Sequence, residues 1–552
     1  MDSFDEEVDV LVLGSGCAAL VAALHAANAG LSVTVCEKTR KLGGTSAMSA
    51  GGIWIPANQL AAEAGIHDSL ADAYEYVRAV APVGWDFPLH WRALLEAGPM
   101  MLQLLRSKTP LRFKLTREPD PFADAPGARA GGRMFSVLPI SRLAARRDAF
   151  RVRGSTLPEL FTYHEVLETD LYHRPIWTTF QLLPRLIGRL LTLSAGKGTA
   201  LMIGLVRGCQ DAGVRLRSRA EGKELILEDD RVVGALVDDR GTPRRIKGRI
   251  ATLIATGGFE WNDEMMQRHF VRPIQFLGSP AGNAGDGHRM AEAAGAELAA
   301  MDQANVTAAI PRRYEGAIHG MPVPYHAEEN AIVVNRHGKR FWDELHVNFG
   351  EALIERDAQS GEPLHLPAFV ITDARYLRKA PLVRFLSRLV PGWLVKAQTI
   401  AELAGKIGLD AQVLHQTVER FNGFAAAGTD EDFGRGKTRA HQKADKRKRA
   451  GLEPIVRPPF IALRFNPSVM STKGGPRTDS RGRVLRTDGR VIEGLYAAGA
   501  SMANPIGTRG AGAGTTLGPF MSWGYLCADD IVNKAREGTR ASADRKTANL
   551  NA

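Results

Sequence analysis

The chain has 552 residues, of which 44% are hydrophobic and 24% charged, a composition typical of globular proteins with room for two domains. Its net charge of +11 is dispersed except for the run from Lys443 to Arg449, which has neither zinc-knuckle spacing nor interleaved aromatics and does not indicate nucleic-acid binding. An acidic N-terminus unlike a signal peptide, four cysteines without a CxxC pair and no long uncharged apolar run predict a cytoplasmic protein without a membrane span.

The first predicted element is residues 8–13, VDVLVL, a short apolar run typical of a buried parallel strand. A glycine-rich turn follows, then a helical pattern over 20–30 and a second strand, 31–37, which ends in Glu37. This order predicts a dinucleotide fold, in which the helix N-terminus faces a pyrophosphate and Glu37 binds ribose hydroxyls. The turn residues expected at the cofactor are Gly14, Ser15, Gly16, Ala18 and Ala19, with Ala19 in the third glycine position.

A long glycine-rich extension comes directly after this acid, at 38–56, KTRKLGGTSAMSAGGIWIP. It suits a ligand that continues past its diphosphate, as FAD does through its ribityl chain, and so it favours FAD over NAD. Hydroxyl groups in the extension are expected to bind the diphosphate and the ribityl chain. The cofactor-binding residues predicted here are Lys38, Gly43, Gly44, Thr45, Ser46, Ser49, Gly51 and Gly52.

Further along, residues 199–205 begin a helix, and 213–218, 224–239 and 249–259 have the pattern of strands, with Asp229-Asp230 as a hairpin turn. The last apolar run ends in glycines, which indicates that backbone passes close to a ligand. A helix is predicted to open near 283–288, where Asp286 either caps it or binds a cofactor hydroxyl. Cofactor contacts are expected at Ala255, Thr256, Gly257 and Asp286.

From about residue 301 to 459 the sequence has more aromatics, proline and histidine, which predicts a second, catalytic domain that covers the cofactor. Residues 1–300 and 460–552 would then form one FAD-binding domain. The stretch 180–205 is apolar but interrupted by basic residues, which excludes a span. A second basic and apolar stretch, 377–396, is either a helix packed on its own domain or a peripheral contact with a membrane surface.

The nucleotide-fold pattern returns at 494–501, GLYAAGAS, and in a glycine-dense loop within 507–532 that leads into a helix. Backbone N–H groups at such a helix start attract electron-rich groups, and the pyrimidine edge of a flavin is one. The contacts expected here are Gly499, Ala500, Gly514, Thr516 and Leu517. The predicted fold class is α/β, with a Rossmann-type FAD-binding domain split in sequence and a second, smaller α+β catalytic domain.

Several segments resemble the flavoproteins related to 3-ketosteroid Δ1-dehydrogenases and fumarate reductases, almost from end to end. They are KLGGTSAMSAGGIWIP (41–56), AIVVNRHGKRFWDE (331–344), LVKAQTIAELA (394–404), DFGRG (432–436), STKGGPRTDSRGRVL (471–485), and IEGLYAAGA with GAGTTLGPFMSWGYLCA (492–528). Within this family, STKGGPRTD and GTTLGP favour the ketosteroid dehydrogenase branch. The resemblance also implies non-covalent FAD, because members that link flavin covalently use a histidine near the first glycine-rich loop, and residues 38–56 contain none.

The resemblance implies a reaction, the removal of two hydrogens from adjacent carbons next to a ketone. In that branch a base takes the proton of the α-carbon while flavin accepts a hydride from the β-carbon. A backbone N–H and a tyrosine hydroxyl hold the ketone oxygen, and the backbone donor corresponds to Gly514. The substrate implied is a small-molecule cyclic ketone, with an unknown electron acceptor and no metal.

The family's active-site tyrosines are replaced in this sequence. The family pattern TYPGAG corresponds to residues 509–514, so Gly510 stands at the carbonyl-binding tyrosine, and Asn348 stands at the base tyrosine. The position of a third active-site tyrosine falls near Pro121-Phe122. Because an asparagine cannot act as a base, His346 and Tyr325 are the candidates to replace it, and for each a purely structural role is the alternative.

Arg509 is a further departure within the same loop. Because a guanidinium binds a carboxylate through two parallel N–H bonds, Arg509 is a candidate anchor for a substrate carboxylate, which would indicate a small keto-acid in place of a steroid. The alternative is an ion pair with a surface acid or with the flavin phosphate.

Three functions remain open at this point. The first is an FAD-dependent ketone desaturase. The second is an enoate reductase of the fumarate-reductase type, which Ala500 in place of a family glutamate disfavours. The third is a flavin-carrying binding or redox-sensing protein without turnover.

Overall fold

The computed structural model describes residues 3–435, 451–512 and 514–550. The basic run at 443–449, Gly436 of the DFGRG segment and Ala513 of the loop that matches TYPGAG lie outside the described residues.

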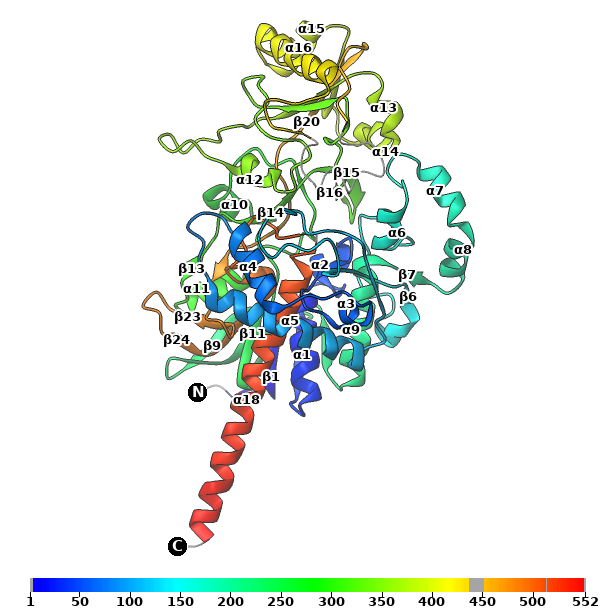
Figure 1. Cartoon of the computed structure of the whole chain (residues 1–552). Coiled ribbons are helices and arrows are strands. Elements are labelled where there is room, and N and C mark those ends of the chain that lie inside the picture. The colour runs from blue at the N-terminus through cyan, green and yellow to red at the C-terminus, as the bar shows by residue number, and fades with distance from the viewer. Residues whose placement is uncertain (1–2, 436–450, 513, 551–552) are drawn as a thin grey trace.

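The lower part of the molecule in Figure 1 contains an eight-stranded sheet. Its parallel strands lie in the order β8–β2–β1–β11–β24, which, numbered along the chain, is the 3-2-1-4-5 order of a doubly wound nucleotide fold. These strands are β1 (Glu6–Leu13), β2 (Val33–Glu37), β8 (Arg215–Ser218), β11 (Thr242–Ile254) and β24 (Val491–Ala497). Because β24 follows residue 490 and pairs with β11, the α/β fold with a nucleotide-binding sheet split in sequence is confirmed.

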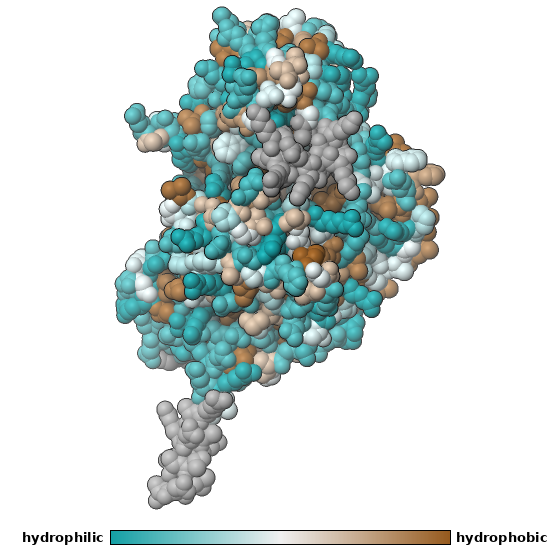
Figure 2. Space-filling model, in the orientation of Figure 1, coloured by the Kyte–Doolittle hydropathy of each residue, from teal (hydrophilic) through white to brown (hydrophobic). Residues whose placement is uncertain are grey.

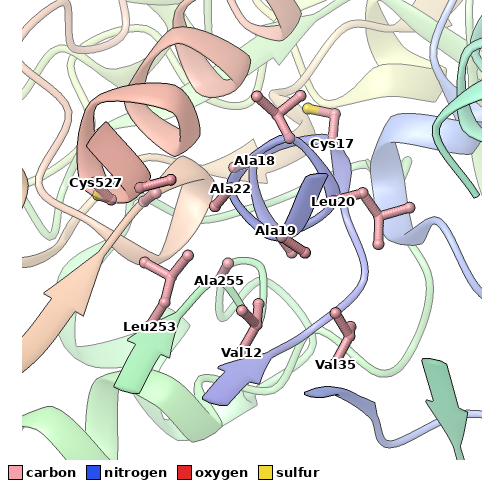
Figure 3. Packing of buried hydrophobic residues seen from close by; sticks show 14 of the residues in the cluster. Val12, Cys17, Ala18, Ala19, Leu20, Ala22, Val35, Leu253, Ala255 and Cys527 are labelled. Carbon is pink, nitrogen blue, oxygen red and sulfur yellow. The ribbon is translucent and has the colours of Figure 1, made fainter. Parts of the chain in front are cut away.

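Two helices from opposite ends of the sequence pack on this sheet, α1 (Cys17–Asn28) and α18 (Leu517–Leu550). Figure 3 shows Ala19 of α1 on the side that faces Val12 and Leu253 of the strands, which lets the helix approach the sheet closely. A Cβ on Gly524 of α18 would lie 2.2 Å from the carbonyl oxygen of Ala18. The small residues therefore bring the two helices into direct contact above the sheet.

The predicted hairpin forms an antiparallel extension of the sheet. Strands β9 (Ala220–Glu228) and β10 (Arg231–Asp239) pair with each other, and β10 also pairs with β11. Asp229 and Asp230 have φ angles of 47° and 65°, as a two-residue type I′ turn requires. The helix predicted from residue 199 is α9 (Lys197–Asp211). The helix predicted near 283–288 is α11 (Asp286–Ala293), and its N-cap is Gly285, so Asp286 lies in the first turn.

A second unit lies at the top of Figure 1. It contains an antiparallel sheet in the order β17–β18–β20–β19, with α15 (Ile400–Ile407) and α16 (Ala411–Ala427) on one face. Alternate residues of the strands pack on these helices and on a second hydrophobic cluster, as in a sheet that is buried on both faces. The strands are β17 (Ala331–Val334), β18 (Phe369–Thr372), β19 (Leu394–Ala397) and β20 (Phe460–Arg464).

Short strands join the two units. Strand β21 (Ser468–Thr472) pairs with β12 (Phe276–Leu277) and with β14 (Ala304–Thr307), and β15 (Ala309–Tyr314) forms a hairpin with β16 (Ala317–Pro322). Strands β20 and β21 follow residue 459 yet pair with strands that precede it. The division of the chain into two domains stays a prediction, and we propose that the second one includes these two strands.

The remaining elements surround the sheets. Next to the site lie α2 (Gly44–Met48), β3 (Gly52–Trp54), β4 (Phe113–Leu115), β5 (Met134–Val137) and α6 (Tyr163–Glu168). Elsewhere the structure has α3 (Gln59–Glu63), α4 (Leu70–Val80), α5 (Pro88–Lys108), β6 (Ile140–Ser141), α7 (Pro175–Gln181), α8 (Leu183–Leu191), β7 (Ser194–Ala195), α10 (Asp263–His269), β13 (Leu298–Ala299), α12 (Phe349–Ile354), α13 (Tyr376–Lys379), α14 (Pro381–Leu386), β22 (Gly475–Pro476) and β23 (Arg483–Leu485). None of the helices in the described residues combines the length and the apolar character that crossing a membrane requires.

Candidate active site

A cavity of about 300 Å³ lies where β1, β2 and β11 end and where α1 and α18 begin. Every predicted cofactor residue except Ala19 and Gly43 lines it. Ala19 is buried between α1 and the sheet, and the amide of Gly43 donates to the Ser15 hydroxyl 3.0 Å away. The cavity therefore joins the first 60 residues of the chain to its last glycine-rich loop.

The acid at the end of β2 is held in place from two sides. Ser15 Oγ donates to Glu37 Oε2 at 2.6 Å, and the amide of Thr39 donates to Glu37 Oε1 at 2.8 Å. Because each carboxylate oxygen has more than one lone pair, Glu37 can still accept hydrogen bonds from ribose hydroxyls. Ser15 thus links the turn, the acid and the following loop into one unit.

The two glycines of the first turn have different surroundings, which tests whether a dinucleotide fits. Gly14 has a φ of 103°, and a Cβ there would lie 2.1 Å from the carbonyl oxygen of Ala255. A Cβ on Gly16 would have Ser46 Oγ, 3.6 Å away, as its nearest neighbour. The space that Gly16 leaves therefore belongs to the cavity, where backbone is free to approach a pyrophosphate. These residues fit FAD.

Lys38 and Asp286 form an ion pair at the rim of the same cavity, and Arg289 Nη2 donates to Asp286 Oδ1 at 2.7 Å. Asp286 is therefore bound by two cations. Its place in the cavity lining agrees with the prediction of a cofactor contact, and the N-cap at Gly285 disfavours the capping alternative.

The three positions that hold tyrosines in the resembling family lie together in space. Asn348 Oδ1 accepts from the amide of Gly510 at 3.0 Å, and the amide of Asn348 donates to His346 Nδ1 at 3.1 Å. The His346 ring meets Phe122 edge to face, with the ring centroids 5.9 Å apart. None of these four residues lines the cavity, whereas Gly514 of the same loop does.

Buried ion pairs support the segment that carries His346 and Asn348. Arg340 Nη2 lies 2.8 Å from Glu344 Oε2 and 3.0 Å from Asp430 Oδ2, and Arg435 Nη1 lies 3.4 Å from Glu344 Oε2. All four side chains are almost completely buried. Arg340 and Glu344 of the segment 331–344 therefore contact Arg435 of the segment 432–436, outside the cavity lining.

Tyr325 is placed differently from its predicted role as a base. It is fully buried, its hydroxyl donates to the carbonyl oxygen of Arg464 at 2.6 Å, and Gln275 Nε2 donates to that hydroxyl at 3.1 Å. Burial raises the pKa of Tyr325. Because Tyr325 is absent from the described cavity lining and its hydroxyl is already bonded, this geometry favours the structural alternative over a role as base.

Arg509 binds an acid of the protein. Its Nε lies 2.8 Å from Glu351 Oε1, its Nη2 lies 2.6 Å from Glu351 Oε2, and its Nη1 donates to the carbonyl oxygen of Val80 at 3.0 Å. Arg509 is also absent from the described cavity lining. This pairing favours the alternative stated above, an ion pair with an acid of the protein, over a carboxylate anchor.

The structure adds cavity residues for which the sequence carried no motif. Tyr163 at the start of α6 lines the cavity, and its hydroxyl lies 2.9 Å from both carboxylate oxygens of Glu118. Burial and the neighbouring Glu118 raise the pKa of Tyr163. Asn305, Thr307 and Met470 also line the cavity, from strands that join the two units. The sequence of residues 85–198 carries no recognisable signal for the pair of Tyr163 and Glu118.

Comparisons with known proteins bear on the whole chain. The model of the family described as "FAD binding domain" matches residues 9–517. A 3-oxosteroid 1-dehydrogenase of Mycobacterium tuberculosis is 34% identical over 96% of this chain and 99% of its own length. A 4-oxocyclohexanecarboxylate 2-dehydrogenase of Sinomonas cyclohexanicum is 36% identical over 96% of this chain and 93% of its own length.

Among solved structures, the chain is similar to 3-ketosteroid Δ1-dehydrogenase from Sterolibacterium denitrificans in complex with 1,4-androstadiene-3,17-dione. The TM-score is 0.85 at 30% sequence identity, and the match covers 96% of this chain and 100% of that chain. The resemblance to ketosteroid dehydrogenases, the fold class and FAD as the cofactor are thereby confirmed.

Proposed function

Because the chain belongs to the flavoprotein family described as FAD binding domain, we propose that it is an FAD-dependent dehydrogenase that introduces a C=C double bond next to a ketone. The two dehydrogenases to which it is 34% and 36% identical, over nearly all of their lengths, act by their names on cyclic ketones. The observation that carries the proposal is the position of Gly514 at the cavity, beside Gly52, where a backbone amide is expected to hold a ketone oxygen.

The residues of this chain bind and orient both partners in the reaction. Glu37, Lys38 and the amides at the start of α1 would hold the ribose and diphosphate of FAD, and Gly514 and Leu517 would face its ring system. When bound, FAD accepts a hydride from the carbon β to the ketone. A hydrogen bond to the ketone oxygen acidifies the α-carbon, because it stabilises the charge that develops on that oxygen.

The substrate that we favour is recognised through its carbonyl group. Arg509, the residue expected to bind a substrate carboxylate, is paired with Glu351 of the protein itself. Neutral steroid-like ketones and small cyclic keto-acids both carry this carbonyl group, so they are the two classes of substrate to compare.

Anaerobic photometry tests this function. Oxidised protein is mixed with 4-androstene-3,17-dione or 4-oxocyclohexanecarboxylate, and bleaching of the flavin is followed. We expect at least one of these ketones to bleach it. Bleaching by neither, together with rapid reoxidation of the reduced flavin by fumarate, would instead support the enoate-reductase alternative. Failure of both reactions would leave the binding or redox-sensing alternative.

We also propose a cytoplasmic protein that makes peripheral contact with a membrane surface. Its four cysteines are free and buried, which suits a reducing compartment. Helices α7 and α8 expose apolar side chains, and Figure 2 shows hydrophobic surface on the side where Figure 1 places them. A groove that contains Trp177 and Phe180 also contains Pro381, so both apolar stretches of the sequence meet there.

Basic side chains surround this apolar face, which favours an anionic bilayer as its partner. Arg174, Arg185, Arg384 and Arg388 are exposed on or beside α7, α8 and α14. A small-molecule electron acceptor dissolved in the membrane would then have a short path to the protein.

A further inference from the structure

The desaturation proposed above needs a base for the α-proton, and the residues predicted for that role do not supply one at the cavity. Asn348 has no basic group, His346 does not line the cavity, and the buried hydroxyl of Tyr325 is bonded to the carbonyl oxygen of Arg464, outside the cavity lining. A base must come within hydrogen-bonding reach of the carbon that it deprotonates. The search is therefore for a proton acceptor among the residues that line the cavity.

Tyr163 lies at the part of the cavity where the ketone is expected. A Cβ on Gly514 would lie 2.6 Å from the carbonyl oxygen of Gly52, and a Cβ on Gly52 would lie 2.8 Å from the ring of Tyr163. Gly514, Gly52 and Tyr163 thus form a continuous row along one wall. Because Gly52 has no side chain, the Tyr163 ring can lie directly over it.

Glu118 lies behind Tyr163 and has the properties of a proton acceptor. Both of its carboxylate oxygens are 2.9 Å from the Tyr163 hydroxyl, and Thr116 Oγ1 is 3.4 Å from Oε2. Within the described part of the chain, Glu118 has no ion-pair partner. Burial raises the pKa of its carboxyl, although the hydrogen bonds from Tyr163 and Thr116 oppose this.

The hydrogen-bond geometry determines whether Tyr163 can accept a proton from a bound molecule or donate one to it. Because the Tyr163 hydroxyl donates its proton to Glu118, the lone pairs of its oxygen are the part left to act toward a bound molecule. A tyrosine that already donates elsewhere is suited to accept a proton, and less suited to donate to a ketone oxygen.

We propose that Tyr163 and Glu118 together accept the α-proton of the ketone substrate, with Tyr163 as the catalytic residue that touches the substrate and Glu118 as the final acceptor. This inference rests on the proposed desaturase function. It places the residue that touches the substrate on α6, and the final acceptor on the segment after β4, three residues before the position of the third family tyrosine.

The step balances without any other reactant. The α C–H bond breaks and its proton binds to the Tyr163 oxygen, while the proton already on Tyr163 moves to a carboxylate oxygen of Glu118. The electron pair left on the α-carbon forms the new C=C bond as the β-carbon loses its hydride to oxidised FAD. Release of the proton from Glu118 to solvent returns the pair to its starting state.

The test uses the holoenzyme with three variants, Tyr163→Phe, Glu118→Gln and the control Tyr525→Phe. Tyr163→Phe keeps the ring over Gly52 and removes only the hydroxyl. Tyr525 stacks on His25, outside the cavity lining, and its variant removes a phenol hydroxyl in the same way. Flavin content and thermal unfolding are measured for every variant, so that loss of the cofactor or of folding is detected.

Two readouts separate proton transfer from the rest of the reaction. The first is the rate at which 4-oxocyclohexanecarboxylate or 4-androstene-3,17-dione bleaches the flavin under anaerobic conditions. The second is exchange of the ketone's α-hydrogens in D₂O after the flavin has been reduced with dithionite, measured by mass spectrometry. Reduced flavin accepts no hydride, so this exchange reports the base alone.

We expect Tyr163→Phe to lower both rates by about 10²- to 10⁴-fold, the usual contribution of a general base, while Tyr525→Phe stays within about twofold of the wild type. The wild-type bleaching rate should rise with pH as Glu118 loses its proton, and Glu118→Gln should be slow and lack this rise. Bleaching and exchange in folded, flavin-loaded Tyr163→Phe within about threefold of the wild type would overturn the inference. A wild-type protein that no ketone bleaches would instead count against the proposed function.

Discussion

Arg509 and Glu351 face each other through two parallel hydrogen bonds, with Nε 2.8 Å from Oε1 and Nη2 2.6 Å from Oε2. The pair joins the glycine-rich loop before α18 to the first turn of α12, two segments that lie 158 residues apart in sequence. Because three of the five guanidinium N–H groups of Arg509 are engaged by Glu351 and Val80, the arginine stabilises the loop that carries Gly514.

We therefore predict that Arg509→Lys and Glu351→Gln each lower kcat/KM for neutral and for acidic ketones to the same degree. Each change should also lower the free energy of unfolding by about 1–2 kcal/mol, since the pair is only partly buried. The measurements are kcat/KM for both substrate classes and chemical denaturation. A loss confined to the acidic ketone would restore the carboxylate-anchor hypothesis.

Glu37→Ala should weaken FAD binding, because the ribose hydroxyls would lose a charged acceptor. Charged hydrogen bonds contribute about 1.5–3 kcal/mol, which corresponds to roughly 10- to 150-fold in Kd. Titration of apoprotein with FAD, followed by fluorescence quenching, measures this. Glu63→Ala, which removes an exposed carboxylate paired with Arg106, is the matched control and should leave Kd unchanged.

Gly14→Ala should impair folding, whereas Gly16→Ala should impair FAD binding. A Cβ at position 14 meets the carbonyl oxygen of Ala255 at 2.1 Å and requires an unfavourable φ, so this variant should lose folded protein. A Cβ at position 16 enters the cavity without a protein clash, so apoprotein stability should change by less than about 1 kcal/mol. FAD affinity should nevertheless fall in Gly16→Ala by about tenfold or more, a loss of about 1.4 kcal/mol. Equal FAD affinity in Gly16→Ala and wild type would show that the pyrophosphate lies elsewhere.

The purified protein should be yellow and should release all its flavin on acid precipitation. The described residues that line the cavity include no histidine, so they lack the side chain that covalent members of the resembling family use. Absorbance of the supernatant and of the pellet at the flavin maximum measures the release. Yellow colour that stays with the pellet would establish a covalent link.

Binding to lipid vesicles tests the surface formed by α7 and α8. We expect co-sedimentation with vesicles that contain phosphatidylserine, weaker binding at high salt, and little binding to pure phosphatidylcholine, because the apolar face is surrounded by arginines. Replacing Trp177 and Phe180 by serine should abolish co-sedimentation with the phosphatidylserine vesicles. Phe150→Ser is the control, because Phe150 is equally exposed, at 71%, but lies outside these helices. Equal sedimentation of all three proteins would remove the membrane proposal.

Local patterns in the sequence were sufficient to predict the nucleotide fold. The turn at Gly14, the helix after it and the acid Glu37 lie within one βαβ unit, and the hairpin at Asp229-Asp230 is a purely local signal. Periodicity and turn chemistry act over such short distances, so these elements were readable before any tertiary structure was known.

The side-chain pairs at the site depend on contacts that no local pattern encodes. Tyr163 and Glu118 are 45 residues apart, and they meet because β4, just before Glu118, pairs with β5, and α6, which begins at Tyr163, contacts the same strand. Arg509 has the same local sequence whether it binds a substrate or Glu351. The glycine-rich loop identified Arg509 as a candidate, and its residue type identified Tyr325, but only the fold determined which groups already bind these side chains.

The flavin site also sets an order of events during synthesis. Two of its walls come from residues 14–52 and from the last glycine-rich loop with Gly499 and Gly514, and α1 and α18 are in contact above the sheet. At roughly 5–20 residues per second, a ribosome needs about 25 to 100 seconds to reach the second wall. Throughout that time the cavity lacks the loop that closes it beside α18, so the cofactor can be enclosed only after translation has passed the start of α18. Synthesis of the last glycine-rich loop, and not the folding of the first βαβ unit, is therefore the step that allows this site to enclose a flavin.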